Sequence, residues 1–348
     1  MTILIIIIIL AIIFDFINGF HDAANSIATV VSTRVLTPVQ AVIWAAFFNF
    51  VAYFIAKYIF KKFGVAKTIS ETIDISVFEG SMPLISIVLI AALVAAIIWN
   101  LLTWRLGIPS SSSHTLIGGL AGAAIAAYGF KAIHTIGLIA AFIVLAPVIG
   151  MVAGNVIALI TLHMAKRMKP VKAERWFKNI QLVSSAWLSI GHGLNDSQKV
   201  MGVIAVALVV NQHLPGLPHW MAGTDATYMM NNHEWIALVC FGAIALGTVC
   251  GGWKIMKTMG NRITKITPVE GFCAQTAGAM TLFITEMLHI PVSTTHVITG
   301  SIMGVGAVKR LSAVRWGVTK DLVIAWVLTI PVSALIAMII YWILSFFI

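Results

Sequence analysis

Long apolar runs fill most of the chain, and short polar or basic stretches separate them. Many of these runs reach about 20 residues, the length at which a helix crosses the hydrocarbon core of a bilayer. They span roughly 3–34, 38–56, 83–104, 109–129, 133–164, 180–211, 235–253, 270–290, 291–308 and 319–347. The pattern therefore predicts an all-α polytopic membrane protein.

Two of these runs contain clusters of polar residues. The first is Asn-Gly-Phe-His-Asp-Ala-Ala-Asn-Ser at 18–26, and the second is His-Gly-Leu-Asn-Asp-Ser-Gln-Lys at 192–199. Polar groups at membrane depth are costly, so they are functional candidates by default. We expect the helices to break near Asn18 and Gly19 and near Gly193, and the recurring Asn-Asp indicates duplicated halves.

A second repeated element supports the duplication. Ile-Pro-Ser-Ser-Ser-Ser-His at 108–114 matches Ile-Pro-Val-Ser-Thr-Thr-His at 290–296. Proline favours the first helical turn and Ser or Thr caps it, so each copy predicts a helix that starts inside the membrane. A helix start offers backbone N–H donors and a positive dipole end, which suit an anion. The predicted anion-binding residues are Ser111, Ser112, Ser113, Ser293, Thr294 and Thr295.

Counting the runs gives five segments in each half, and an odd number turns the second copy upside down. The sequence thus predicts two inverted-topology repeats whose broken or re-entrant helices meet at a central site. The first repeat covers residues 1–165, a basic linker covers 166–179, and the second repeat covers 180–348.

The distribution of charge sets the expected orientation. The chain is 60% hydrophobic and 10% charged with a formal net charge of +10, and its basic residues cluster in short loops, which indicates a membrane topology signal rather than a nucleic-acid surface. Six of them lie in the linker, which predicts a cytoplasmic linker and two outward termini. One loop departs from this rule, because its lysines would lie outside with only partial acidic compensation: Lys57, Lys61, Lys62 and Lys67 beside Glu71, Asp74 and Glu79.

Several ionisable residues are candidates for coupling to a cation or proton. Asp22 and Asp196 rank first, because an ionised carboxylate in the membrane needs a cation, proton or donor to compensate it. His21 and Lys199 are the other two candidates for this coupling role. Lys199 stands three residues after Asp196 on one helical face, so the two can pair. His114, His296, Asp15 and Glu286 are secondary candidates, either as relays or as interhelical contacts only.

Taken together, the four motifs at 18–29, 108–114, 192–199 and 290–296 resemble those of the inorganic phosphate transporter (PiT) family, in its bacterial low-affinity form. The resemblance implies a secondary transporter of the cell membrane with inverted repeats, and a homodimer. It also implies that the phosphate and cation sites are lined by Asp22, Asn25, Ser111, Ser112, Ser113, Asn195, Asp196, Ser293, Thr294 and Thr295.

The chain departs from the sodium-coupled branch of that family at two places. His21 replaces the first Asn of the signature, and Gln198-Lys199 stands where Ala24-Asn25 stands in the first half. This departure is similar to bacterial members that carry phosphate or metal-phosphate with protons. We therefore expect phosphate import by symport with H⁺, with Na⁺ coupling, a metal-phosphate substrate and a sulfate substrate as open alternatives. No cofactor and no fixed metal are expected.

Two other classes of protein fit the sequence less well. A channel needs a continuous polar lining, whereas polar residues here concentrate at four places. An intramembrane hydrolase can be assembled from Ser113, His114 and Asp22, but residue types alone give no nucleophile geometry. The substrate chemistry favours phosphate over sulfate, since phosphate keeps a P–OH donor that a carboxylate accepts. The sequence predicts a carrier rather than an enzyme.

Overall fold

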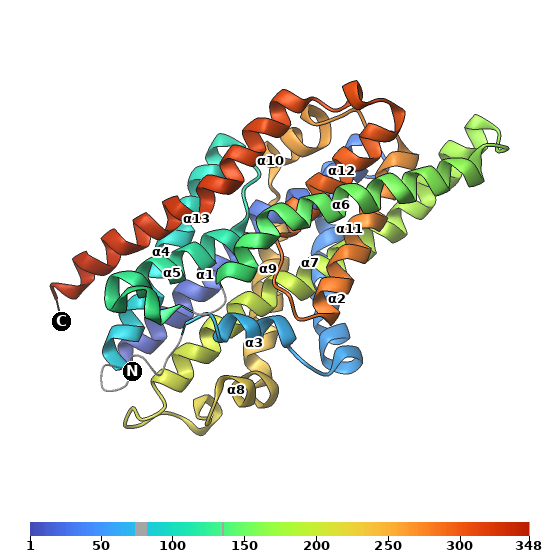
Figure 1. Cartoon of the computed structure of the whole chain (residues 1–348). Helices are drawn as coiled ribbons and strands as arrows, with labels where there is room; N and C mark the ends of the chain where they lie inside the picture. Colours follow the sequence, from blue (N-terminus) through green and yellow to red (C-terminus); the bar gives the residue numbers. More distant parts are fainter. Residues whose placement is uncertain (74–81, 134–135, 348) are drawn as a thin grey trace.

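The protein was analysed as a computed structural model that describes residues 1–73, 82–133 and 136–347. These residues form a helical bundle without strands, apart from one isolated bridge between Ile73 and Ile133. The α-helices are α1 (Thr2–Ser32), α2 (Pro38–Ile55), α3 (Gly64–Ser70), α4 (Met82–Leu106), α5 (Ser112–Tyr128), α6 (Ile136–Ala165), α7 (Pro170–Val210), α8 (Ala226–Asn232), α9 (Glu234–Cys250), α10 (Trp253–Lys257), α11 (Pro268–Met287), α12 (Thr294–Lys309) and α13 (Trp316–Ser345). The all-α prediction is confirmed (Figure 1).

Fewer helices span the membrane by length and composition than the ten expected runs. Among the described residues seven helices qualify, and the bent pair α8 and α9 gives an eighth if it counts as one span. The α12 helix has only 16 residues, so it rises about 24 Å, less than the hydrocarbon thickness of about 30 Å. The shortfall arises partly because α12 starts only after an extended segment inside the bundle.

The predicted helix breaks in the first and sixth apolar runs are wrong. Both α1 and α7 continue through their polar clusters. The glycines there permit close packing instead: a Cβ at Gly19 would lie 2.2 Å from the carbonyl oxygen of Ile244, and one at Gly193 would lie 2.6 Å from that of Asn49. The structure instead has non-helical segments before α5 and before α12.

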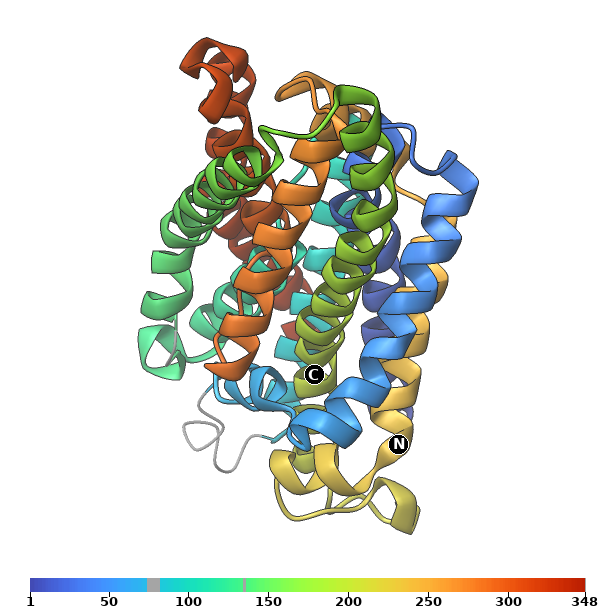
Figure 2. The same ribbon diagram turned by 90° about the vertical axis from the view of Figure 1, so that its right-hand side faces the viewer.

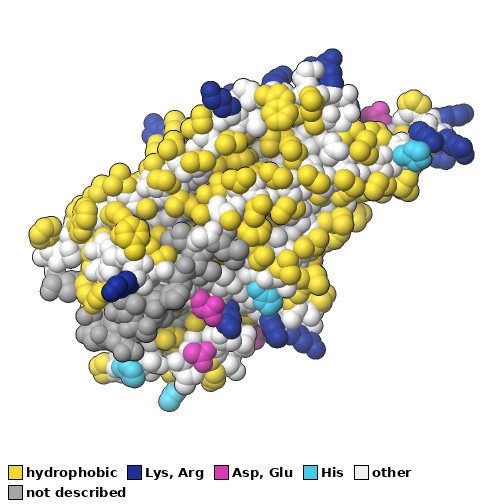
Figure 3. Space-filling model, viewed as in Figure 1, with side chains coloured by type: hydrophobic (Ala, Val, Ile, Leu, Met, Phe, Trp, Pro, Cys, Tyr) yellow, Lys and Arg dark blue, Asp and Glu magenta, His cyan; other side chains and the backbone are white. Residues whose placement is uncertain are grey.

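The predicted linker is also mostly helical, because α7 begins at Pro170 and leaves only residues 166–169 between α6 and α7. This turn projects from one end of the bundle, where basic side chains gather (Figure 3). Both chain termini lie toward the opposite end, and α1 and α7 run in opposite directions (Figures 1 and 2). Two acidic residues of the loop that departs from the charge rule, Asp74 and Glu79, lie outside the described residues.

Helices from the two halves of the chain pack against each other in matched pairs. The α1 helix packs against α9 while α7 packs against α2, and α5 packs against α13 while α12 packs against α6. Each of these contacts joins one helix of the first half to one helix of the second. The two halves are therefore interleaved, and the polar clusters of α1 and α7 are brought to the middle of the bundle.

Candidate functional site

The starts of α5 and α12 have the same local structure. The Ser111 hydroxyl accepts a hydrogen bond from the backbone N–H of His114 (3.2 Å), and Ser293 caps His296 in the same way (3.2 Å). Both capping serines are buried. The two starts adjoin, since the Ser113 hydroxyl lies 3.4 Å from the carbonyl oxygen of Val292, in the segment that leads into α12. The predicted helix starts inside the bundle are confirmed.

Asp22 lies on α1 beside the start of α5. One carboxylate oxygen accepts a hydrogen bond from the Ser112 hydroxyl (2.9 Å), and the other lies 2.6 Å from Nδ1 of His21. The opposite ring nitrogen of His21 lies 3.1 Å from Thr103 Oγ1 and 3.4 Å from Ser110 Oγ, on either side of the break before α5. The first carboxylate is thus held by its own half of the chain.

Asp196 on α7 has a corresponding contact and an added charge. The Thr294 hydroxyl donates to one carboxylate oxygen (3.2 Å), as Ser112 does to Asp22. Lys199 Nζ lies 2.7 Å from the other oxygen, so the pairing expected from their spacing is present. The ammonium also donates to the Ser113 hydroxyl (2.5 Å) and to the Val292 carbonyl (2.7 Å), which joins α7 to the start of α5.

Asn25 makes the equivalent cross-contact from α1. Its amide nitrogen donates to Thr294 Oγ1 (3.2 Å) and Thr295 Oγ1 (3.0 Å) at the start of α12. Asn25 and Lys199 each stand three residues after an aspartate and each bind the helix start of the other half. The four predicted motifs therefore meet at one place.

A candidate cation site lies between the two aspartates. Asp22, His192 and Asp196 are buried, and each offers one ligand atom within 4.8 Å of the other two. Carboxylate oxygens suit hard cations, and imidazole adds a nitrogen ligand or a proton acceptor. Sequence reasoning did not select His192, although its position four residues before Asp196 places both on one helical face.

The remaining predicted residues lie around this centre rather than in it. Asn195 is buried, and in the described part of the chain neither side-chain amide atom has a hydrogen-bond partner. The rings of His114 and His296 lie 4.7 Å apart, and His296 packs against Trp326. Glu286 accepts a hydrogen bond from Gln198 (2.6 Å), and Asp15 is buried without a hydrogen-bond partner among the described residues. Sequence reasoning also missed Thr103, which no motif marks, and Ser110, which lies in the motif at 108–114 but was not selected as a site residue.

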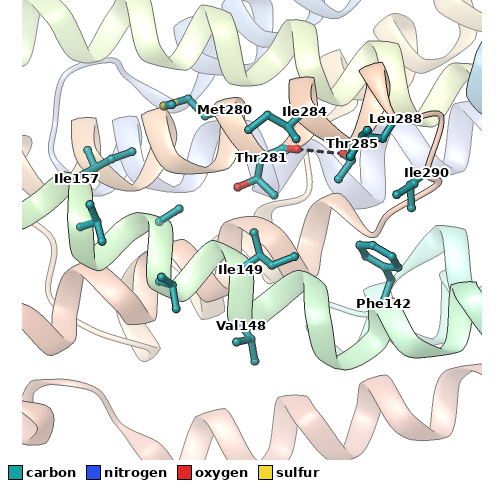
Figure 4. A pocket seen from close by; sticks show the side chains of 13 residues that line it. Phe142, Val148, Ile149, Ile157, Met280, Thr281, Ile284, Thr285, Leu288 and Ile290 are labelled. Atoms are coloured by element: carbon teal, nitrogen blue, oxygen red, sulfur yellow. Dashed lines mark hydrogen bonds between the residues drawn. The ribbon is translucent and has the colours of Figure 1, made fainter.

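An apolar groove of about 560 Å³ between α6 and α11 is a poor candidate for phosphate (Figure 4). Thr281 and Thr285 line it, but their hydroxyls donate to the backbone carbonyls of Ala277 (2.9 Å) and Thr281 (3.0 Å). The other lining side chains are apolar, such as Val152 and Ile284, which are about half exposed. The groove has the composition of a surface that faces lipid tails.

Comparison with known proteins agrees with the chemistry of this centre. A family model described as the phosphate transporter family matches residues 18–337. The chain belongs to this family. A probable low-affinity inorganic phosphate transporter of Rhizobium meliloti (strain 1021) is 48% identical over 73% of each chain, and one of Bacillus subtilis (strain 168) is 45% identical over 81% of each chain.

A solved structure described as the sodium-dependent phosphate transporter shares the fold of this chain. The two chains superpose with a TM-score of 0.83 over 100% of each and are 27% identical. The family resemblance expected from the four motifs is confirmed. Since the family and these relatives are transporters, the protein is not an enzyme, and the intramembrane hydrolase is discarded.

Proposed function

We propose that this protein imports inorganic phosphate by symport with a cation, and that the cation is H⁺. The observation that carries the proposal is the meeting of two capped helix starts with two buried aspartates. Helix starts bind anions and carboxylates bind cations, so one centre accommodates both species. The substrate is proposed from the relatives, which are described as probable low-affinity inorganic phosphate transporters.

Phosphate fits the hydrogen-bonding groups of the centre. The Ser112 and Thr294 hydroxyls now donate to Asp22 and Asp196, and they are free to donate to an anion once a cation or proton compensates the carboxylates. A phosphate P–OH then donates to a carboxylate, whereas sulfate has no donor and meets the same carboxylate as a like charge. The centre therefore selects phosphate over sulfate.

The coupling ion is proposed from the charges. Lys199 already compensates Asp196, which leaves His21 and Asp22 to take up the transported proton. Na⁺ is the second candidate, favoured by the three-ligand group of Asp22, His192 and Asp196 and by the sodium-dependent structural relative. A divalent metal carried with phosphate would use the same three ligands.

The topology follows from the positions of the basic turn and the termini. We place the turn at 166–169 and the basic residues after it in the cytoplasm, with both termini outside, because positive charge is retained inside. The matched helix pairs of the two halves support an inverted duplication. A homodimer in the cell membrane stays a prediction.

Counterflow in proteoliposomes tests the substrate. Vesicles that hold unlabelled phosphate should concentrate radiolabelled phosphate transiently when they contain the protein. Sulfate inside should not support the effect, and vesicles without protein serve as the control. Counterflow driven by sulfate, or none driven by phosphate, would overturn the proposal.

A further inference from the structure

Free hydrogen-bond donors lie between the central site and the linker end of the bundle. Ser26 and Thr29 on α1, Ser185 on α7, and the amide nitrogens of Gln181 on α7 and Gln275 on α11 are buried, and within the described ranges none has a hydrogen-bond partner. A buried donor without a partner destabilises the folded protein, because it has lost its hydrogen bonds to water. Five unpaired donors in one region therefore destabilise the fold considerably unless a ligand accepts hydrogen bonds from them.

The donors on α1 and α7 lie on the same helix faces as the aspartates of the central site. At 100° per residue, Ser26 and Thr29 lie within about 40° of Asp22 on α1, and Gln181 and Ser185 lie within about 60° of Asp196 on α7. Two hydrogen bonds fix the helices side by side at this level. Thr33 donates to Gln181 Oε1 (3.0 Å), and Ser184 donates to Gln275 Oε1 (3.0 Å).

Unpaired carboxylates lie on the opposite side of the site. Toward the chain termini, the unpaired buried atoms include both carboxylate oxygens of Asp15, Asn18 Oδ1 and Glu286 Oε2. These atoms are acceptors, which repel an anion and suit a cation or proton. The unpaired carboxylates therefore lie on one side of the site, and the five donors lie on the other.

We propose that Ser26, Thr29, Gln181, Ser185 and Gln275 form a second oxyanion site, which phosphate occupies between the central site and the linker end. This inference rests on the proposed function. The five groups donate without carrying charge, so they hold a tetrahedral oxyanion weakly and release it, as a site along a path requires.

Gln181 closes this site in the structure. It is held by Thr33 on one side, and α11 packs directly on it, because a Cβ at Gly271 would lie 2.2 Å from Gln181 Nε2. The carboxamide must turn away from α11 before an anion can pass. The same motion turns its unpaired N–H groups toward the anion.

Cysteine modification tests the site. In a background without Cys240, Cys250 and Cys273, Thr29→Cys or Ser185→Cys is exposed in proteoliposomes to a negatively charged methanethiosulfonate, added to either side. A cysteine at Lys172 reports which side carries the linker. The same Lys172→Cys, which is exposed at the start of α7 and away from the proposed site, is the matched control.

We expect modification at 29 and 185 from the linker side, slowed about tenfold by phosphate at ten times its dissociation constant. Phosphate should not change the rate at Lys172→Cys. Modification that phosphate does not slow, or none from either side at both positions, overturns the proposal. If either Thr29→Cys or Ser185→Cys misfolds, the other variant still tests the site, since the two residues lie on different helices.

A neutral substitution gives a second measurement. Ser185→Ala should lower the maximal rate of uptake and leave phosphate affinity at the central site unchanged; an unchanged rate contradicts the second site. Phosphate counterflow by the wild type tests the proposed function. Protection of the cysteines by phosphate tests the second oxyanion site. The failure of either is therefore seen separately.

Discussion

The two halves of the central site share one geometry and differ in charge. In each, an aspartate accepts a hydrogen bond from the helix start of its own half, and the side chain three residues later binds the helix start of the other half. That side chain is the neutral Asn25 in the first half and the cationic Lys199 in the second. Duplication supplies the framework, and one position makes the halves unequal. Lys199 compensates Asp196, while the neutral Asn25 stands at the corresponding position after Asp22.

Removing either carboxylate should have the largest effect and should separate the halves. Asp22→Asn and Asp196→Asn should each abolish phosphate accumulation, because a neutral amide holds no cation. Only Asp196→Asn should also destabilise the protein, by about 3–5 kcal/mol, because it leaves the Lys199 ammonium buried and unpaired. Uptake in proteoliposomes and thermal unfolding in detergent measure the two effects. Transport at the wild-type rate in both variants would contradict the assignment.

Restoring the balance of charge in the second half should recover stability. The double variant Asp196→Asn with Lys199→Asn removes both members of the pair, so it should regain most of the stability lost in Asp196→Asn. Lys199→Asn alone should weaken transport at neutral pH, because Asp196 then needs an external cation. Thermal unfolding of the three variants tests this. A double variant no more stable than Asp196→Asn would show that the pair is not the cause.

Removing a hydroxyl from either helix start should weaken phosphate binding to the same extent, since the two starts are equivalent in the two halves. Ser112→Ala or Thr294→Ala should raise the apparent KM for phosphate about tenfold or more, because a hydrogen bond to a charged ligand contributes about 1.5–3 kcal/mol. Expression should change less than KM does. An unchanged KM in both variants would leave these hydroxyls with a structural role only.

Asn25 should show the smallest effect. Asn25→Ala removes neutral hydrogen bonds to Thr294 and Thr295, worth about 1 kcal/mol each. We expect a modest fall in phosphate uptake, much smaller than that of Lys199→Asn. Initial uptake rates of the two variants at equal protein content make the comparison. Equal losses would mean that charge does not distinguish the halves.

Local rules of sequence predicted much of this site. Proline followed by Ser or Thr gave the starts of α5 and α12, and the three-residue spacing gave the pair of Asp196 and Lys199. The same rules failed for Gly19 and Gly193, where they predict helix breaks that the structure does not contain. A glycine can interrupt a helix or allow a neighbouring backbone to pack closely against it. Which of the two occurs depends on the helix that packs there, and the residues around the glycine in the sequence do not reveal that helix.

Contacts between the two halves could not be predicted from the sequence for a related reason. The hydrogen bonds from Asn25 to Thr295 and from Lys199 to Ser113 depend on how α1 and α7 are placed against the opposite helix starts. Thr103 and Ser110 contact His21 only because the chain turns before α5. None of these placements leaves a periodic pattern in the sequence.

Imposed ion gradients test the central claim, that Lys199 replaces a transported cation and a proton drives uptake. Proteoliposomes with equal potassium on both sides and valinomycin hold the membrane potential near zero, so that a pH gradient or a sodium gradient against choline can be applied alone. We predict that an inwardly directed proton gradient drives phosphate uptake and that a sodium gradient does not. Strict dependence on sodium, with no response to pH, would contradict the account.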